Sequence, residues 1–137
     1  MLYFAYGSNL HHFQMKRRCK DSHFIKKINL RNFKLTFRSK YRAADIEVKK
    51  NSIVPGALYE ISKSDEKKLD VYEDYPNLYK KYYFHYYGSK VMTYTMVSKS
   101  PFRFPTERYL NIVKQGYKDC NLDKKYLQKA LIEKGTS

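Results

Sequence analysis

The sequence predicts an α+β fold, with a small, mainly antiparallel, barrel-like sheet and flanking helices. Strand-like segments dominate the first two-thirds of the 137-residue chain, and helical patterns are inserted among them and appended after them. A Gly-Ser pair separates two neighbouring strand-like runs, which is typical of an antiparallel hairpin. The length suits one core and no linker or repeat divides it, so we predict a single domain over residues 1–137.

The chain begins with a short apolar segment. Residues 2–5 are aromatic and apolar, which indicates a buried strand. After a break at a glycine, Ser8 or Asn9 is predicted to cap a helix that runs to about Arg18. Leu10 and Phe13 fall on one face of this helix.

Strands are then predicted at 25–30 and 32–37, the second with apolar residues at alternate positions. A basic stretch over 38–52 is predicted to be irregular. A further strand at 53–61 contains a Pro-Gly pair, which predicts a bulge or a close approach of the backbone.

The second half of the chain is predicted to contain a helix, a hairpin and two more helices. Ser62 or Ser64 caps the first helix, and the Pro-Asn pair at 76–77 ends it. The remaining predicted elements are hairpin strands at 79–87 and 91–97, a helix from 105–106 to about 117, and a helix over 123–134.

Positive charge is the strongest feature of the composition. The chain has 28 Lys and Arg against 13 Asp and Glu, a formal net charge of +15, and such a balance attracts polyanions without sequence preference. Its 15 tyrosines add surfaces for stacking single-stranded nucleic acid. The basic residues are scattered and form no tail. We therefore expect weak, non-specific polyanion binding, and a non-catalytic basic module that binds nucleic acid is the alternative function.

Two isolated cysteines, Cys19 and Cys120, form no Cys-x-x-Cys motif, and only His11-His12 brings two potential metal ligands together. We therefore expect no metal site. Two reduced thiols indicate a cytoplasmic protein. The N-terminal apolar segment is too short for a signal-peptide core and no apolar run is long enough to span a membrane, so we expect no membrane partner. The oligomeric state is left open.

The segment Tyr6-Gly7-Ser8-Asn9 joins the first strand to the first helix. Amides at a helix N-terminus lack intrahelical partners and attract negative charge, and a glycine lets a ligand approach the main chain. The segment is therefore a candidate pocket for a carboxylate or a developing oxyanion. A plain strand-to-helix turn explains the same residues, and spacing alone favours that explanation.

Glu73 is the candidate acid/base. It follows Leu69 by four residues and lies at the margin of the apolar helix face. A position near the helix C-terminus and partial burial both raise a carboxylate pKa toward neutral pH. The alternative is a solvent-facing Glu73, or one paired with Lys80 or Lys81.

Other polar residues add no catalytic motif. The neighbouring Asp70 and Asp74 fall on other helix faces and are expected at the surface, although Asp70 is also placed to brace the turn after the strand. The four histidines form no Cys-His or Ser-His-Asp arrangement, so the sequence supports no hydrolytic triad.

Taken together, these segments resemble the γ-glutamylcyclotransferase-like (AIG2-like) family. Its signature Tyr-Gly-Ser-Asn-Leu is present at residues 6–10, called the signature loop here, and its Leu-Asp-x-Tyr-Glu segment is present at 69–73. Asp74 stands where the family often has Gly. Further matches in the same order, over about residues 3 to 117, are Met15, Arg18, Cys19, the strand at 30–37, Gly56-Ala57-Leu58-Tyr59, Tyr79 to Lys81, Tyr94 and Tyr109-Leu110.

The resemblance implies a fold in which the signature loop and a catalytic Glu73 line one cavity. It implies intramolecular aminolysis of the acyltransferase or lyase type, which cyclises the γ-glutamyl group of a small substrate to 5-oxoproline and releases an amino acid or amine. Neither metal nor cofactor is implied, and an added carboxylate at Asp74 would raise the pKa of Glu73. The implied substrate-binding residues are Tyr6, Gly7, Ser8, Asn9, Leu10, Tyr79 and Tyr109.

Overall fold

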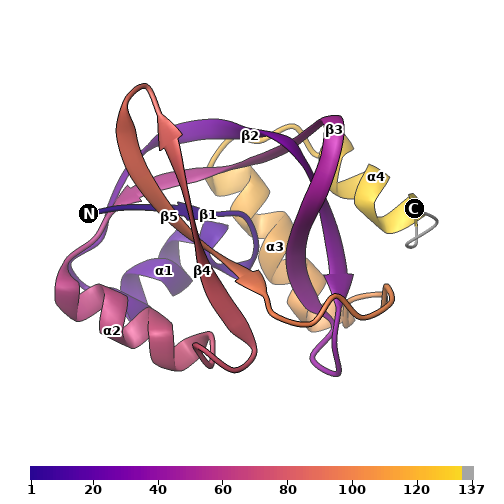
Figure 1. Ribbon diagram of the computed structural model, residues 1–137, viewed down its shortest axis with the longest axis horizontal. Helices are drawn as coiled ribbons and strands as arrows, with labels where there is room; N and C mark the ends of the chain where they lie inside the picture. Colours follow the sequence, from indigo (N-terminus) through magenta and orange to yellow (C-terminus); the bar gives the residue numbers. More distant parts are fainter. Residues whose placement is uncertain (134–137) are drawn as a thin grey trace.

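A five-stranded mixed sheet in the order β2-β3-β1-β5-β4 organises the chain (Figure 1). The computed structural model describes residues 1–133. The strands are β1 (Leu2–Ala5), β2 (His23–Arg38), β3 (Ala43–Glu60), β4 (Tyr79–Tyr86) and β5 (Ser89–Met96). The helices are the 3₁₀ turn η1 (Ser8–Leu10), α1 (His12–Arg18), α2 (Lys63–Tyr72), α3 (Glu107–Asp119) and α4 (Lys125–Glu133).

The four-residue strand β1 is the centre of the sheet. It pairs antiparallel with β3 and parallel with β5, while β2–β3 and β4–β5 are antiparallel pairs. Within the described residues no ladder joins the two edge strands, β2 and β4, so the sheet curves without closing. The predicted α+β class with a mainly antiparallel sheet is confirmed.

The long β2–β3 hairpin corrects two predictions. Residues 43–52, predicted to be irregular, belong to β3, and 43–48 of them pair with 33–38 across the hairpin. The two strands predicted at 25–30 and 32–37 form one strand with a register shift between Arg31 and Phe33. Asn32 adopts φ 66° there, and its side-chain oxygen accepts a hydrogen bond from the Asn51 amide at 3.0 Å.

The first helix also differs from its prediction. Residues 8–10 form the separate turn η1, and α1 begins after His11, whose Nδ1 accepts a hydrogen bond from the Gln14 amide at 3.3 Å. The change of direction between η1 and α1 buries Leu10 and Met15 and leaves Phe13 69% exposed, so the predicted cap and the predicted common face of Leu10 and Phe13 are wrong.

The remaining elements follow local signals in the sequence. Ser62 caps α2 in a reciprocal capping box with Asp65, and Thr106 caps α3. The β4–β5 turn places Tyr87 and Gly88 at positive φ, as a two-residue hairpin requires. Helix α2 ends at Tyr72, before the predicted Pro-Asn stop. The predicted end of the last helix at residue 134 lies outside the described residues.

The core lies between the sheet and the helices, and close backbone contacts define it. Gly56 of β3 faces β1 so closely that a Cβ there would lie 2.3 Å from the Ala5 carbonyl oxygen, which confirms the predicted close approach. The fully buried side chains of this core include Phe4, Phe37, Leu69 and Val113. None of the helices in the described part of the chain is long and apolar enough to cross a membrane.

Candidate active site

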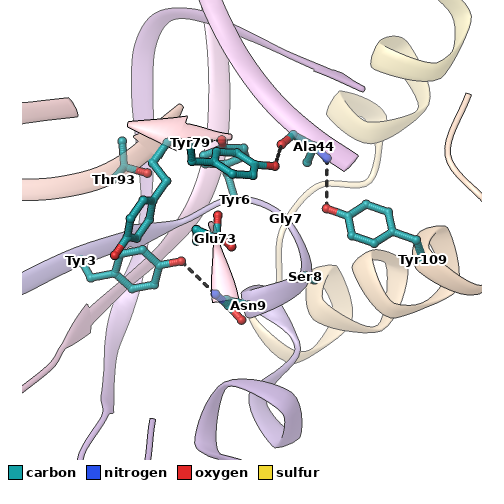
Figure 2. A pocket seen from close by; sticks show the side chains of 11 residues that line it. Tyr3, Tyr6, Gly7, Ser8, Asn9, Ala44, Glu73, Tyr79, Thr93 and Tyr109 are labelled. Carbon is teal, nitrogen blue, oxygen red and sulfur yellow. Dashed lines mark hydrogen bonds between the residues drawn. The ribbon is translucent and has the colours of Figure 1, made fainter. Parts of the chain in front are cut away.

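The predicted residues converge on a small cavity beneath the sheet (Figure 2). Its volume is about 30 Å³, enough for one or two water molecules. The signature loop, the C-terminus of α2 and tyrosines from β1, β4, β5 and α3 form its walls. Its lining residues are Tyr3, Tyr6, Gly7, Ser8, Asn9, Ala44, Glu73, Tyr79, Thr93, Tyr94 and Tyr109.

Glu73 sits at the C-cap of α2, where its amide donates to the Leu69 carbonyl at 2.8 Å. Figure 2 shows its side chain pointing into the space between Tyr3, Tyr6 and the signature loop. Among residues 1–133 its carboxylate accepts no hydrogen bond and forms no ion pair. The alternative pairing with Lys81 is wrong, because the Lys81 ammonium binds Glu66 and Asp70 instead.

The surroundings of Glu73 change its acidity. Burial raises its pKa from the usual 4.5 to about 8, and the positive charge of Arg18 acts in the opposite direction by lowering it. Asp74, which was expected to raise the pKa further, is exposed and is not among the causes of this shift. A carboxyl group with a pKa near 8 exchanges protons readily at neutral pH.

The signature loop holds its shape through short-range backbone bonds. The amides of Leu10 and His11 donate to the carbonyls of Gly7 and Ser8 at 3.1 and 3.2 Å. The amides of Ser8 and Asn9, at the start of η1, find no acceptor within the described residues and are available to a ligand. Gly7 has a φ of −122°, so its backbone is not left-handed. Glycine is favoured here because a side chain would crowd Ala44 and Tyr109.

Arg18 and Tyr72 lie beside the cavity at Ser8. The Arg18 guanidinium donates to Asn9 Oδ1 at 2.6 Å and to Ser8 Oγ at 3.3 Å, and it stacks on the Tyr72 ring. The Tyr72 hydroxyl lies 3.3 Å from Ser8 Oγ. Neither partner of Ser8 is a general base, so the geometry gives no support to Ser8 as a nucleophile.

The tyrosine hydroxyls around the cavity fall into two kinds. Tyr6 and Tyr79 donate to the backbone carbonyls of Tyr94 and Ala44, both at 2.7 Å. Tyr3 and Tyr109 instead accept hydrogen bonds, from the Asn9 side-chain amide and the Ala44 amide, both at 3.0 Å (Figure 2). Within residues 1–133 no acceptor takes the protons of these last two hydroxyls.

Burial keeps these tyrosines protonated. It raises the pKa of Tyr3, Tyr6, Tyr79 and Tyr109 well above the usual 10.0, with smaller contributions from the nearby Glu73 charge. Tyr3 and Tyr109 therefore present two O–H donors to any oxygen atom in the cavity at neutral pH.

One predicted site residue lies elsewhere. Leu10 does not line the cavity: its side chain is fully buried and packs against Gly116 of α3, because the turn at η1 directs it into the core. Its place in the motif is therefore structural. The other predicted residues, namely Tyr6, Gly7, Ser8, Asn9, Glu73, Tyr79 and Tyr109, all line the cavity.

Sequence reasoning missed four lining residues that come from three strands. Tyr3 lies on β1, where alternation along the strand could have placed it on the face opposite Phe4. Thr93 and Tyr94 lie on β5, and Tyr94 was noted only as a family match. Ala44 contributes its backbone from a stretch predicted to be irregular, so no sequence signal pointed to it.

The aspartates next to Glu73 have structural roles. Asp70 accepts hydrogen bonds from the Tyr94 hydroxyl at 2.6 Å and from Lys81 at 3.1 Å, so it braces α2 against β4 and β5 instead of lying free at the surface. Asp74 adopts φ 50°, a left-handed conformation that favours glycine but that aspartate tolerates. In the described part of the chain no group of three or more His, Cys, Asp and Glu side chains is arranged to hold a metal ion.

Comparisons with known proteins agree with this geometry. A family model described as gamma-glutamyl cyclotransferase, AIG2-like, matches residues 3–116. A solved structure described as a gamma-glutamyl cyclotransferase aligns with a TM-score of 0.78 and 25% identity, over 95% of this chain and 85% of that one. A human protein described as uncharacterized aligns with a TM-score of 0.78 and 26% identity, over 94% and 85% of the two chains.

The fold extends to more distant proteins. YkqA from Bacillus subtilis shares it with a TM-score of 0.78 at 19% identity, over 96% of this chain and 54% of that one. No curated protein sequence gives a significant match.

Proposed function

Because the chain belongs to the gamma-glutamyl cyclotransferase, AIG2-like family, we propose that it cyclises the γ-glutamyl group of a small substrate to 5-oxoproline and releases an amino acid or amine. The observation that carries this proposal is the unpaired Glu73 carboxylate, which faces the signature loop inside one cavity. The reaction needs one group that accepts and then returns a proton, and Glu73 has the acidity for both steps.

The first step is a proton transfer from the substrate. The Glu73 carboxylate takes a proton from the α-ammonium group, and the resulting amine attacks the γ-carbonyl carbon to form the five-membered ring. Because nucleophile and carbonyl belong to the same molecule, the protein mainly has to hold the substrate in a ring-closing shape.

The second step breaks the bond to the leaving group. As the carbonyl re-forms, the C–N bond to the leaving amine breaks and protonated Glu73 gives its proton to that nitrogen. The regenerated Glu73 carboxylate then takes the second proton from the ring nitrogen, which leaves the neutral lactam, and passes it to the departing amine. Two protons thus move in turn through Glu73 from the α-nitrogen to the leaving nitrogen, and no water is consumed.

Charge on the reacting oxygen needs hydrogen-bond donors that are already in place. The free O–H groups of Tyr3 and Tyr109 and the free amides of Ser8 and Asn9 are suited to this role and to binding the substrate's α-carboxylate. Tyr79 donates to the Ala44 carbonyl, and the Ala44 amide donates to the Tyr109 hydroxyl. Tyr79 therefore acts by holding the wall of the cavity that positions Tyr109.

Substrate entry requires movement at the cavity. A volume of about 30 Å³ does not accommodate a glutamyl group. Arg18 and Tyr72 are the groups expected to move, because they lie beside Ser8 and Tyr72 is 45% exposed. Arg18 has a second role, since its charge limits the rise in the pKa of Glu73.

The direct experiment measures 5-oxoproline by liquid chromatography after incubation with a panel of γ-glutamyl amino acids and γ-glutamyl amines. Release from at least one member, absent with Glu73→Gln, supports the proposal and identifies the leaving group. No release from any member would favour the alternative of a non-catalytic basic module on the same fold.

The activity should depend on pH through Glu73. The free enzyme needs the carboxylate form, so kcat/KM should fall about tenfold per pH unit as the pH drops below about 8. A profile that stays flat from pH 6 to pH 8 would exclude Glu73 as the base, because this range reaches about two units below its pKa.

The same pKa shift predicts an opposite trend in stability. Between pH 4.5, the usual glutamate pKa, and about 8, folded Glu73 holds a proton that the unfolded chain has lost. Stability therefore decreases as the pH rises through this window. The Glu73→Gln variant has no such pH-dependent decrease in stability. Thermal denaturation should therefore show its Tm rising relative to that of the wild type as the pH approaches 8.

Substitutions in the signature loop should have unequal effects. A Cβ at Gly7 would lie 3.1 Å from both Ala44 Cβ and Tyr109 Oη, so Gly7→Val should displace the tyrosine donor, raise KM and lower kcat. Ser8→Ala loses only contacts to Tyr72 and Arg18, roughly 0.5–2 kcal/mol. Steady-state kinetics on variants folded by circular dichroism test the ranking. An inactive Ser8→Ala beside an unaffected Gly7→Val would reverse it.

A further inference from the structure

A second concave site lies between the two open edges of the sheet. It is a groove of about 580 Å³, with residues 27–31 and Phe33 of β2 on one side, and Tyr82 and residues 84–87 of β4 and its turn on the other. Figure 1 shows the β4–β5 hairpin extending past β2 at this end of the molecule. Among the described residues, none that lines this groove also lines the Glu73 cavity.

Side chains already bridge the two edges. The rings of Phe33 and Tyr82 meet edge to face with centroids 5.4 Å apart, and the Lys26 ammonium lies 5.2 Å from the centre of the Tyr86 ring. These contacts occupy the space that an inserted β-strand would need. A ligand of the groove therefore meets side chains and not the backbone edges.

The elements around the groove carry no acidic residue. Residues 22–44 contain seven Lys and Arg, residues 75–106 contain five, and neither segment contains Asp or Glu. Within residues 1–133, no carboxylate pairs with Lys26, Lys27 or Arg31. Of these twelve cations, Arg38, Lys81 and Lys99 pair with carboxylates of neighbouring elements. The two that line the groove, Lys27 and Arg31, do not, so the groove favours an anion.

The groove also presents aromatic faces. Tyr87 at the hairpin turn is 92% exposed, and Tyr82 is 37% exposed and stacks with Phe84 at 6.4 Å. Rings beside cations that pair with no carboxylate match a ligand that alternates flat bases with phosphates. An acidic peptide would use the cations but leave the rings unused.

We propose that this groove binds single-stranded nucleic acid, with phosphates on Lys27 and Arg31, and on Lys26 at its margin beside Tyr86, and with bases on Tyr82 and Tyr87. A duplex buries the faces of its bases, so it binds less tightly than a single strand. The binding has no sequence preference, because stacking and phosphate contacts do not read base edges. The site is independent of the proposed cyclotransferase reaction, so either function can fail without the other.

The test uses the full chain and a fluorescent oligothymidylate of about 20 nucleotides, with anisotropy measured at about 150 mM salt. The groove variant combines Arg31→Gln with Tyr87→Asn, because both residues line the groove and Asn suits the positive φ of 47° at residue 87. The control variant combines Lys40→Gln with Tyr41→Asn, two exposed residues between β2 and β3 that do not line the groove. Both variants lose one positive charge and one exposed ring.

The groove variant should bind about tenfold more weakly or worse, and the control should stay within about twofold of wild type. Tyr87→Phe alone should keep wild-type affinity, because it keeps the ring. Equal weakening of both double variants, equal affinity for a duplex of the same length, or no binding by the wild type would overturn the proposal. Release of 5-oxoproline by the groove variant should match wild type, which separates the two functions.

Discussion

Glu73→Gln should reduce kcat by about 10² to 10⁴, or more because one group serves both proton transfers. Glutamine keeps the shape of the side chain but cannot accept the substrate's ammonium proton. Since the Glu73 carboxylate has no hydrogen-bond or ion-pair partner among residues 1–133, its replacement breaks no structural contact. Steady-state 5-oxoproline release gives the rate, and isothermal titration calorimetry should show substrate affinity within about threefold of wild type.

The matched control is Asp74→Asn. It removes the neighbouring carboxylate, and asparagine tolerates the φ of 50° at this position. Asp74 is exposed and does not contribute to the pKa shift of Glu73, so this variant should keep nearly full activity. A Glu73→Gln enzyme with more than about a tenth of wild-type kcat would assign the base to another group.

Gly116→Ala should cause a large loss of stability, although residue 116 does not line the Glu73 cavity. A Cβ there would lie 2.4 Å from Leu10 Cβ and 2.8 Å from the His11 amide nitrogen. Overpacking of this kind costs about 1–3 kcal/mol, and more when backbone has to move. Leu10 and His11 end the η1 turn. Movement of these two residues away from the added methyl group would therefore shift the signature loop and should lower kcat/KM as well.

Thermal denaturation and steady-state kinetics test both consequences together. Asn111→Ala is the matched control, because it lies on the exposed face of the same helix and adds a better helix former. It should leave both the Tm and kcat/KM near wild type. Wild-type values for Gly116→Ala would mean that α3 does not support the signature loop.

The sequence located much of the candidate site because its main parts are contiguous. The signature loop is one segment and Glu73 follows Leu69 on a short helix, so the family motifs could be matched without any knowledge of the fold, whereas spacing alone favoured a plain turn at the loop. Leu10 shows the limit of this reasoning. Its place in the motif suggested the substrate site, but the η1 turn directs it to Gly116 instead. A sequence motif identifies the residues, whereas the backbone conformation decides where their side chains point.

The sequence by itself determined the features that depend on near neighbours: a serine cap on α2, a helix start at Thr106, a hairpin turn that contains Gly88 and the strand of β1. These rest on hydrogen bonds and steric preferences within a few residues. Only the structure selected Ser62 over Ser64 and placed the turn at Tyr87-Gly88 instead of the predicted Gly88-Ser89. Only the tertiary structure decided that residues 43–52 form a strand, because their partners lie across the β2–β3 hairpin. It alone brought Tyr3 and Tyr109 to Glu73 and buried that carboxylate enough to raise its pKa to about 8. Burial depends on residues distant in the chain, so no local pattern encodes it.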